Sequence, residues 1–547
     1  MTDPSPGSAH PDLGARRWYK DALVYELSVR TFADGNGDGI GDFRGLTGRL
    51  DYLAALGVTT VWLLPFQPSP WRDDGYDVSD YYGVHPDFGD LGDFARFVEQ
   101  ASDRGMRVLI DLVLNHTSDE HPWFQAARAG DRRYRDYYVW SKRKPADAEK
   151  GIVFPGVQKT TWSYDRMAGQ YYFHRFYDFQ PDLNVANPAV RDEMEKVIGF
   201  WLNLGIAGYR VDAVPFLIEP VSAEHTSPGP VFDYLHEFRN YLSWRAGDAA
   251  LLGEANVERD EIADYYGVGG LHMLFNFTVM QHLWLALARG DAGPVVEALE
   301  QTAGIPESDQ WANFLRNHDE VDLGRLADDE RADVFRAFAP QKRMQLYDRG
   351  IRRRLAPMLG GDRRRIELAL AILLALPGTP VVYYGDELGM GDDLSLKERE
   401  PVRTPMQWAS ARNGGFSTAP RAQLCAPVVS RGPFAYSKVN ASDQRRDPSS
   451  LLSWFRRAAQ VRRESPEIGN ASWKPVAGGT PSVLALRYEQ EGRRLIVLHN
   501  LSAEPVRTRL DARGTYDVLA DREYEPAGAS VELDGYGYRW LRPVDSL

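Results

Sequence analysis

The sequence predicts an α/β fold: a (β/α)8 TIM barrel with a small domain inserted after the third strand and a β-sandwich at the carboxyl end. Three observations support this. Short apolar or β-branched runs alternate with amphipathic helical patterns through most of the 547 residues. Eight such runs can be distinguished along the chain. Several of them end in polar residues, which is where barrel enzymes carry their chemistry.

The eight predicted strands are separated by segments long enough to hold helices. The clearest helix is VRDEMEKVIGFWLNLG, which closes on a glycine, a common residue at helix ends. Its apolar residues recur at helical spacing at Val190, Met194, Val197, Trp201 and Leu204. We expect the strands at residues 22–29, 58–66, 107–116, 208–214, 251–256, 272–277, 313–319 and 379–387.

Two segments depart from the barrel pattern. The stretch after the third strand, rich in Tyr, Trp, Lys, Asp and Pro, is too long for an ordinary loop and predicts an inserted domain. After about residue 455 a helix gives way to short alternating strands, which predicts a β-sandwich. The expected organisation is a flexible leader (1–16), a catalytic barrel (17–116 and 190–455), an inserted domain (117–189) and a C-terminal helix with β-sandwich (456–547).

The composition excludes several classes of function. A formal charge of -13, from 77 acidic and 64 basic residues, argues against a nucleic-acid partner. The longest apolar run, LALAILLALPG, is about half of the roughly 20 residues that a membrane span needs and predicts a buried helix instead. No Gly-Lys dipeptide occurs, so a Walker loop is excluded and no organic cofactor is expected.

Two further features indicate the cellular compartment of the protein. The first residues lack the apolar core of a secretory signal, and the single cysteine, Cys425, allows no internal disulfide. Both favour a reducing, cytoplasmic location. The sequence leaves open whether the chain forms a homo-oligomer.

The stretch GYRVDAV places two opposite charges in a predicted buried strand. Arg210 and Asp212 are two residues apart, so they lie on the same face, which in a parallel barrel faces the axis. An arginine beside a carboxylate lowers the carboxylate pKa, and we expect it to keep Asp212 ionised, as a nucleophile requires. A structural ion pair would give the same pattern, so this motif alone leaves both interpretations open.

Three carboxylates end separate predicted strands: Asp212 the fourth, Glu254 the fifth and Asp319 the seventh. Retaining glycoside cleavage needs an ionised nucleophile and a protonated acid about 5–5.5 Å apart. A third carboxylate can stabilise the oxocarbenium-like transition state. The placement of these groups therefore predicts chemistry on an acetal.

Six motifs in order along the chain resemble those of a known enzyme family. DLVLNH, GYRVDAV, LLGEAN and FLRNHD look like the four signature regions of the α-amylase family of retaining glycosidases and transglycosylases. DDGYD and QPDLN match two further signatures, and GTPVVYYGDELGM fits the eighth strand. A structural coincidence would not produce six matches at the expected strand ends.

The resemblance implies a role for each matching residue. Asp212 would be the nucleophile, Glu254 the general acid and base, and Asp319 the transition-state stabiliser. The remaining matches would surround the sugar: Asp73 and Tyr76 framing the pocket for the non-reducing glucose, His116, His318 and Arg210 binding hydroxyls or orienting the nucleophile, and Arg399 as a lid arginine.

The stretch DGNGDGIGD suggests a cation site. Oxygen-bearing side chains at intervals of two and four residues suit a hard cation. The stretch resembles the calcium site near the first barrel strand of family members that act on oligosaccharides. The resemblance implies a structural Ca²⁺ held by Asp34, Asn36, Asp38 and Asp42 and by the carbonyl of Ile40.

Within the family, the chain is most similar to members that interconvert maltose and trehalose, as WYKDALVYELSVRTFADGNGDGIGDFRGLT, GIRRRLAPML and VRTPMQW illustrate. Ala213 resembles members that act on α-1,4 links. The pattern departs at EPVSAEHTSPGPVFDYLHEF after the fourth strand, in KRKPADAEKGIVFPGVQKTTWSYD, at Ala207 and in KEREP. Two alternatives therefore stay open: an α-glucosidase that hydrolyses short α-1,4-gluco-oligosaccharides, and a non-catalytic sugar-binding relative.

Overall fold

A computed structural model describes residues 17–219, 221, 230–267, 269–476, 480–490 and 492–544. The predicted leader (1–16) and part of the divergent segment after the fourth barrel strand lie outside the described residues.

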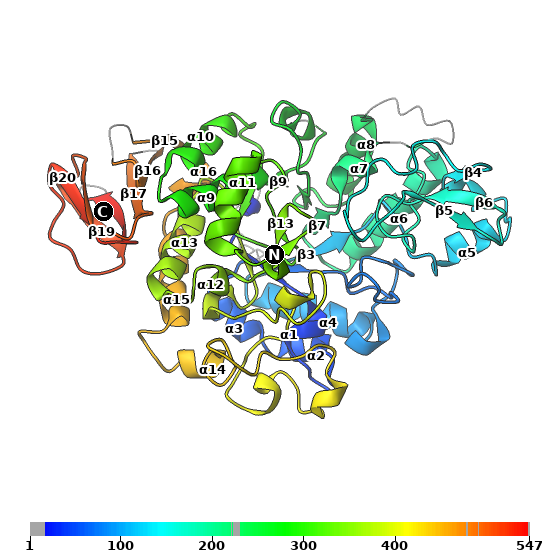
Figure 1. Cartoon of the computed structure of the whole chain (residues 1–547), viewed down its shortest axis with the longest axis horizontal. Helices are drawn as coiled ribbons and strands as arrows, with labels where there is room; N and C mark the ends of the chain where they lie inside the picture. Colours follow the sequence, from blue (N-terminus) through cyan, green and yellow to red (C-terminus); the bar gives the residue numbers. More distant parts are fainter. Residues whose placement is uncertain are drawn as a thin grey trace, which may run out of the picture.

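In the described part of the chain, eight parallel strands close into a barrel, which confirms the predicted fold (Figure 1). Around the barrel each strand pairs with its neighbours in the order β1, β2, β3, β7, β8, β9, β10 and β14, which returns to β1. Their bounds are β1 Val24–Leu27, β2 Thr60–Leu63, β3 Arg107–Leu112, β7 Gly208–Val211, β8 Ala250–Gly253, β9 Met273–Phe275, β10 Gln310–Phe314 and β14 Thr379–Tyr383.

Most of the barrel strands end earlier than the sequence predicts. β3 ends at Leu112, so His116 lies in the loop that follows, and β10 ends at Phe314, before His318 and Asp319. The polar residues leave the strand pairing because their groups have other partners. The backbone N–H of His318, for example, donates to Glu26 Oε1 at 2.9 Å. The predicted strands were right in number and order but ran on into the site loops.

The helices form the outer layer of the barrel. The predicted helix is α6, with Asn187 as its cap, Pro188 at its first position and Gly205 in the left-handed region just after it. Between β8 and β9 the described residues hold only a short 3-10 turn, Ile262–Tyr265, so the regular strand-helix alternation is broken there. The α-helices are α1 Val29–Phe32, α2 Phe43–Thr47, α3 Leu50–Ala55, α4 Leu91–Asp103, α5 Pro122–Arg128, α6 Pro188–Asn203, α7 Val214–Leu217, α8 Phe232–Arg245, α9 Phe277–Arg289, α10 Gly293–Gln301, α11 Asp328–Phe338, α12 Leu355–Met358, α13 Arg363–Ala375, α14 Ala441–Gln444, α15 Leu451–Arg463 and α16 Glu467–Asn470.

The long apolar run is the buried helix that the sequence predicts. It lies in α13, which is almost wholly buried from Ile366 onward. Among the described residues, no helix combines the length and apolarity needed to cross a membrane.

The segment between β3 and β7 carries its own small sheet, which Figure 1 shows to one side of the barrel. Its strands are β4 Trp140–Ser141, β5 Trp162–Asp165 and β6 Gln170–Phe173, paired in the order β4, β6, β5. Trp162 and Phe173 pack in a separate apolar cluster beneath this sheet. The insertion thus reaches the barrel mouth as a folded unit rather than as a long loop.

The carboxyl end forms two antiparallel sheets at the opposite side of the view in Figure 1. One contains β15 Ser472–Pro475, β16 Val483–Gln490, β17 Arg493–Asn500, β21 Tyr538–Pro543 and β19 Thr515–Ala520, and the other contains β18 Val506–Arg509 and β20 Ser530–Leu533. A shared core joins them, with residues such as Leu498, Val531 and Leu541. The predicted boundary at 455/456 falls inside α15, which packs against the barrel helix α13.

A third small sheet lies beside the barrel mouth. It pairs β11 Val321–Asp322 with β13 Gly350–Ile351, and β13 with β12 Gln345–Leu346. The sheet fixes the loop after β10 to a segment about thirty residues further along the chain.

Candidate active site

Arg210 lies at the centre of the barrel mouth and is fully buried. Its Nη1 contacts Asp111 Oδ1 at 2.8 Å and Asp212 Oδ1 at 2.7 Å, and its Nη2 contacts Glu254 Oε2 at 2.9 Å. One guanidinium therefore holds carboxylates from three successive strands. The strand that carries it must pack closely on β8: a Cβ at Gly208 would lie 2.0 Å from the carbonyl oxygen of Ala250.

Asp212 and Glu254 are linked a second time through the backbone after Asp212. Ala213 adopts a left-handed conformation, with φ 49° and ψ 41°, which is uncommon for a residue other than glycine. Its N–H donates to Glu254 Oε2 at 3.2 Å. The strained turn therefore helps to hold the second carboxylate beside the first.

Asp319 sits among a different set of arginines. Its Oδ1 lies 3.0 Å from Arg399 Nη1 and 2.9 Å from Arg403 Nη2. Arg399 also contacts Glu320 at 2.7 Å, and Arg403 also contacts Asp74 at 2.9 Å. The three predicted catalytic carboxylates thus come together at one mouth, but with different neighbours.

These neighbours separate the pKa values of the three carboxyls. Burial raises the pKa of Asp212 to about 6; Arg210 opposes the rise, and Asp111 and Asp319 add to it. Burial likewise raises the pKa of Glu254 to about 7, against the influence of Arg210. Burial acts to raise the pKa of Asp319 too, but Arg399 and Arg403 outweigh it and hold that pKa below its ordinary value.

Arg210 acts on the pKa of Asp212 in the expected direction, but its effect is not the largest one. Arg210 does favour the ionised form of Asp212, but the loss of water and the nearby acids have the larger effect. The arginine limits the rise of the pKa and does not reverse it.

Tyr76 lines the site, and His318 stacks behind it. Their rings stack at 5.5 Å between centroids and 10° between planes, and Tyr76 Oη lies 2.8 Å from His318 Nε2. On the other side of the imidazole, His318 Nδ1 lies 2.7 Å from Glu26 Oε1. Because Nδ1 faces a carboxylate it carries the proton, which leaves Nε2 to accept from Tyr76.

His116 and Asp73 meet through Gln180. Gln180 Nε2 donates to Asp73 Oδ2 at 2.8 Å and lies 3.3 Å from His116 Nε2. Burial lowers the pKa of His116 to about 3, so its ring is neutral at physiological pH. Gln180 comes from the QPDLN motif, so the structure unites two motifs that are distant in sequence.

Sequence reasoning missed two charged residues of the site: Glu26, which lies in β1, and Arg403, which follows the eighth strand. Asp111, from the DLVLNH motif, lies opposite Arg210 in the pairing of β3 with β7. Glu26 carries the same signal that identified Arg210, a lone charge inside an apolar strand. Arg403 lies within VRTPMQW, where no spacing rule connects it to Asp319.

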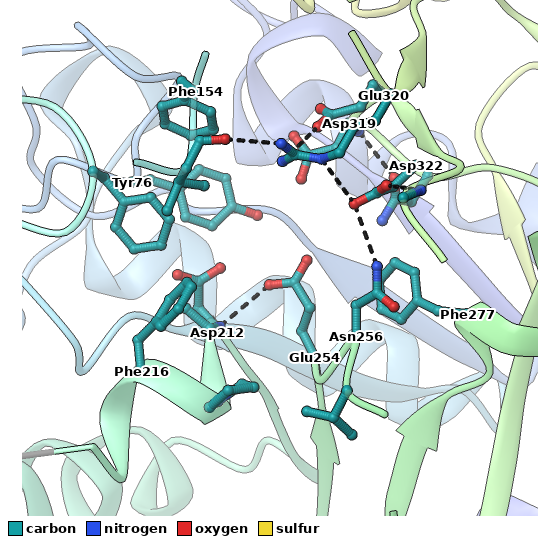
Figure 2. Close-up of a pocket in the computed structure, with 18 of the residues that line it drawn as sticks. Tyr76, Phe154, Asp212, Phe216, Glu254, Asn256, Phe277, Asp319, Glu320 and Asp322 are labelled. Atoms are coloured by element: carbon teal, nitrogen blue, oxygen red, sulfur yellow. Dashed lines mark hydrogen bonds and ion pairs between the residues drawn. The ribbon is translucent and has the colours of Figure 1, made fainter. Parts of the chain in front are cut away.

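The carboxylates face a cavity of about 520 Å³, which is within the size range of small-molecule sites. Figure 2 shows Asp212 and Glu254 directed into it from one side, with Asp319 and Glu320 on the opposite side. Aromatic side chains suited to sugar rings also line it, among them Phe154, Phe216 and Phe277. Of the predicted sugar-binding residues, the cavity is lined by Asp73, Tyr76, His116 and Arg399, whereas Arg210 and His318 lie behind its wall.

A chain of polar contacts links the loops at the rim of the cavity and is drawn as dashed lines in Figure 2. Arg349 Nη1 donates to the carbonyl oxygen of Val153 at 3.0 Å, and Arg349 Nε donates to Asp322 Oδ2 at 3.3 Å. Asn256 Nδ2 then donates to the same Asp322 oxygen at 3.3 Å. The inserted segment, the loop after β10 and the loop after β8 are thereby joined around the mouth. We call these four residues the rim latch.

Phe154, next to the rim latch, is held by aromatic and cationic neighbours. Its ring lies 4.8 Å from that of Tyr177 and 5.0 Å from that of Tyr347, and the guanidinium of Arg399 lies 4.9 Å from its centroid. Arg399 thus contacts both Asp319 inside the site and the insertion at its edge.

The predicted calcium loop lies apart from this cavity. Asp34 accepts three backbone N–H groups, from Asn36, Gly37 and Gly39, and Asp42 also accepts three. Each ionised carboxylate offers about four acceptor positions, so the loop leaves one free on each. No group of three or more His, Cys, Asp or Glu suited to a metal was found among the described residues. The donor set still fits an oxygen-only cation site, and the Ca²⁺ site stays a prediction.

A family model supplies the decisive comparison. The catalytic-domain model of α-amylase matches residues 27–346 and 348–471, and a second model, the C-terminal domain of sucrose hydrolase-like proteins, matches residues 492–542. The chain belongs to the α-amylase family. Membership in the α-amylase family agrees with the six motifs and with the barrel.

Individual relatives indicate which members of the α-amylase family this chain is similar to. Trehalose synthase from Pimelobacter sp. (strain R48) is 41% identical, with 96% of each chain covered. Trehalose synthase from Thermus thermophilus is 47% identical over 89% of this chain, which spans only 50% of that relative's length. Among solved structures, trehalulose synthase MutB from Pseudomonas mesoacidophila MX-45 superposes with a TM-score of 0.78 at 28% identity, covering 96% of this chain and 99% of that one.

Proposed function

We propose that this enzyme interconverts maltose and trehalose by retaining α-glucosyl transfer. The observation that carries the proposal is the 41% identity to a trehalose synthase across 96% of both chains, together with the three carboxylates at the barrel mouth. Maltose and trehalose are its proposed small-molecule partners.

In the first step, Asp212 attacks the anomeric carbon of the non-reducing glucose of maltose while Glu254 gives a proton to the departing glycosidic oxygen. A covalent glucosyl-Asp212 and a free glucose result. The raised pKa of Glu254, about 7, keeps a protonated fraction of this acid near neutrality. Asp319, whose pKa is lowered, stays ionised and stabilises the positive charge on the ring.

In the second step, the freed glucose turns within the cavity and presents its anomeric hydroxyl. Glu254, now a carboxylate, takes the proton from that hydroxyl as its oxygen displaces Asp212 from the anomeric carbon. The product is trehalose. If water takes the place of the glucose, the same step is hydrolysis, so retention of the glucose decides the outcome.

The rim latch supports transfer over hydrolysis in this proposal. It joins the inserted segment to two barrel loops on the side where the departing glucose would sit. Phe154, Phe277 and Asn256 line the cavity there and offer apolar faces and an amide to a sugar.

The test is incubation of the purified protein with maltose, and separately with trehalose, with glucose, maltose and trehalose resolved by chromatography over time. Trehalose from maltose with little free glucose would support the proposal. Glucose as the dominant product would identify an α-glucosidase instead. No change in either sugar would favour a non-catalytic relative or a different substrate.

We also propose a structural Ca²⁺ in the loop of residues 34–42 and a cytoplasmic location. The first is supported by the oxygen groups on Asp34, Asn36 and Asp38. The second is supported by Cys425, which is a free thiol.

A further inference from the structure

A second cavity lies on the outside of the barrel, between α3 and α15. Its volume is about 720 Å³, and it is lined by four arginines: Arg445, Arg456, Arg457 and Arg463. We call it the arginine groove. Such a concentration of positive charge is unexpected in a chain whose formal charge is -13.

The arginine groove is formed by the exposed side of α15. Arg456, Gln460 and Arg463 are four and three residues apart, so they share one face of the helix. The opposite face is buried by residues such as Trp454 and Ala458. All four arginines of the groove are exposed to solvent.

Ion pairing does not explain these arginines. In the described part of the chain, none of the four lies within ion-pair distance of a carboxylate. Two of them bond to backbone only: Arg456 Nε donates to the carbonyl of Ala55 at 2.9 Å and Arg457 Nη1 to that of Pro448 at 3.2 Å. The one carboxylate in the lining, Glu464, accepts from Gln460 at 2.9 Å.

Arginines elsewhere in the chain show the usual arrangement. On α11, Arg336 pairs with Asp333 at 2.8 Å, three residues earlier, and Arg446, next to Arg445, pairs with Asp443 at 3.2 Å. The sequence of α15, LLSWFRRAAQVRR, contains no acidic residue. Positive charges gathered at one cavity repel one another unless an anion offsets them.

We propose that the arginine groove binds a small phosphorylated molecule, either a sugar phosphate or a nucleotide. Guanidinium groups match phosphate oxygens with paired N–H donors and are weakly hydrated, so several of them facing one cavity suit a multiply charged phosphate. The volume is within the range of small-molecule sites.

The arginine groove is distinct from the catalytic site. Ala55 and Gly57 line it and precede the start of β2 at Thr60, whereas the catalytic carboxylates follow the ends of their strands. The groove therefore lies toward the other end of the barrel, and its ligand does not contact the sugar at Asp212.

The test is isothermal titration of the full-length protein at low ionic strength with three probes: pyrophosphate, glucose 6-phosphate and ATP without magnesium. We expect saturable binding of at least one probe, which weakens with added salt. Arg456→Ala combined with Arg463→Ala should weaken that binding about tenfold or more. Arg446→Ala, which removes a neighbouring but ion-paired arginine, should leave it unchanged, and all variants should keep native turnover of maltose.

The results of these titrations distinguish sugar phosphates, nucleotides and acidic proteins as ligands of the groove. Stronger binding of glucose 6-phosphate assigns the groove to sugar phosphates, and stronger binding of ATP assigns it to nucleotides. No saturable binding of any probe, or equal binding by the double variant and the native protein, would overturn the proposal. So would tighter, arginine-dependent binding of a polyglutamate peptide than of any phosphate, because it would assign the groove to an acidic protein.

Discussion

The two ends of the catalytic cavity are built differently. The inner end, around Arg210 and His318, is made of ionisable side chains; these two have side-chain exposures of 1% each and are held by other charged or polar groups. The outer rim is made of loops, and its latch residues Arg349 and Asp322 are 27% and 19% exposed. In the proposed reaction, the inner end positions the reacting carboxylates, and the rim retains the freed glucose beside them.

This difference in construction indicates which part of the site performs the reaction and which part selects the product. Buried charges are costly unless they are paired, so the inner end tolerates little change, and its arrangement suits any retaining member of the α-amylase family. Partly exposed contacts between loops contribute little to stability and can vary. We therefore expect the choice between transfer and hydrolysis to depend on the rim.

The largest effect is expected at the inner end. Asp212→Asn keeps the volume of the side chain but removes the nucleophile, and we expect maltose turnover to fall by at least about a thousandfold. Initial rates with maltose measure this, and circular dichroism and thermal melting check that the fold is retained. If the Asp212→Asn variant stays active while folded, Asp212 is not the nucleophile.

The pH dependence of kcat/KM tests the inner end of the cavity without a mutation. Asp212 must be ionised, so kcat/KM should fall as the pH drops through about 6. Glu254 must be protonated, so kcat/KM should also fall as the pH rises through about 7. Each limb should approach tenfold per pH unit. The control is Glu254→Gln assayed with α-glucosyl fluoride, which needs no acid for its leaving group and should lose the alkaline limb. A native profile that is flat from about pH 5 to 9 would contradict the assignment.

At the rim, the expected change is in product distribution more than in rate. Arg349→Ala removes the bonds to Val153 and Asp322, and we expect the ratio of released glucose to trehalose to rise about fivefold, the equivalent of one hydrogen bond. Arg343→Ala is the matched control, since Arg343 lies in the same segment but bonds to Gln341. Equal ratios in the two variants would show that the latch does not retain glucose.

The smallest effect is expected outside both ends, in the loop of residues 34–42. If Ca²⁺ is bound at about a hundred times its Kd, its removal costs about 2.7 kcal/mol of stability, so EDTA should lower the unfolding midpoint by a few degrees and CaCl₂ should restore it. Asp34→Ala should make the midpoint insensitive to both. An EDTA-insensitive native protein would mean that the loop is closed by its own hydrogen bonds alone.

The inner end could largely be predicted from the sequence, and the rim could not. Alternating apolar runs gave the barrel, and a lone Arg210 in such a run indicated the site. Glu26 carries the same signal and could have been found in that way. The contact of Arg349 with Val153 joins residues 196 positions apart through loops without periodicity, so no local pattern indicates it. The pKa of Asp212 was also out of reach, because it depends on how completely the folded chain excludes water.

In the proposed reaction, the freed glucose stays in the cavity and is used again. The most direct measurement is conversion of unlabelled maltose in the presence of excess ¹³C-glucose, followed by mass spectrometry of the trehalose. We predict that trehalose formed by the native protein is mostly unlabelled, because both glucose units come from the same maltose. Trehalose that carries label in proportion to the free ¹³C-glucose would contradict the claim, since the glucose would then leave and re-enter before transfer.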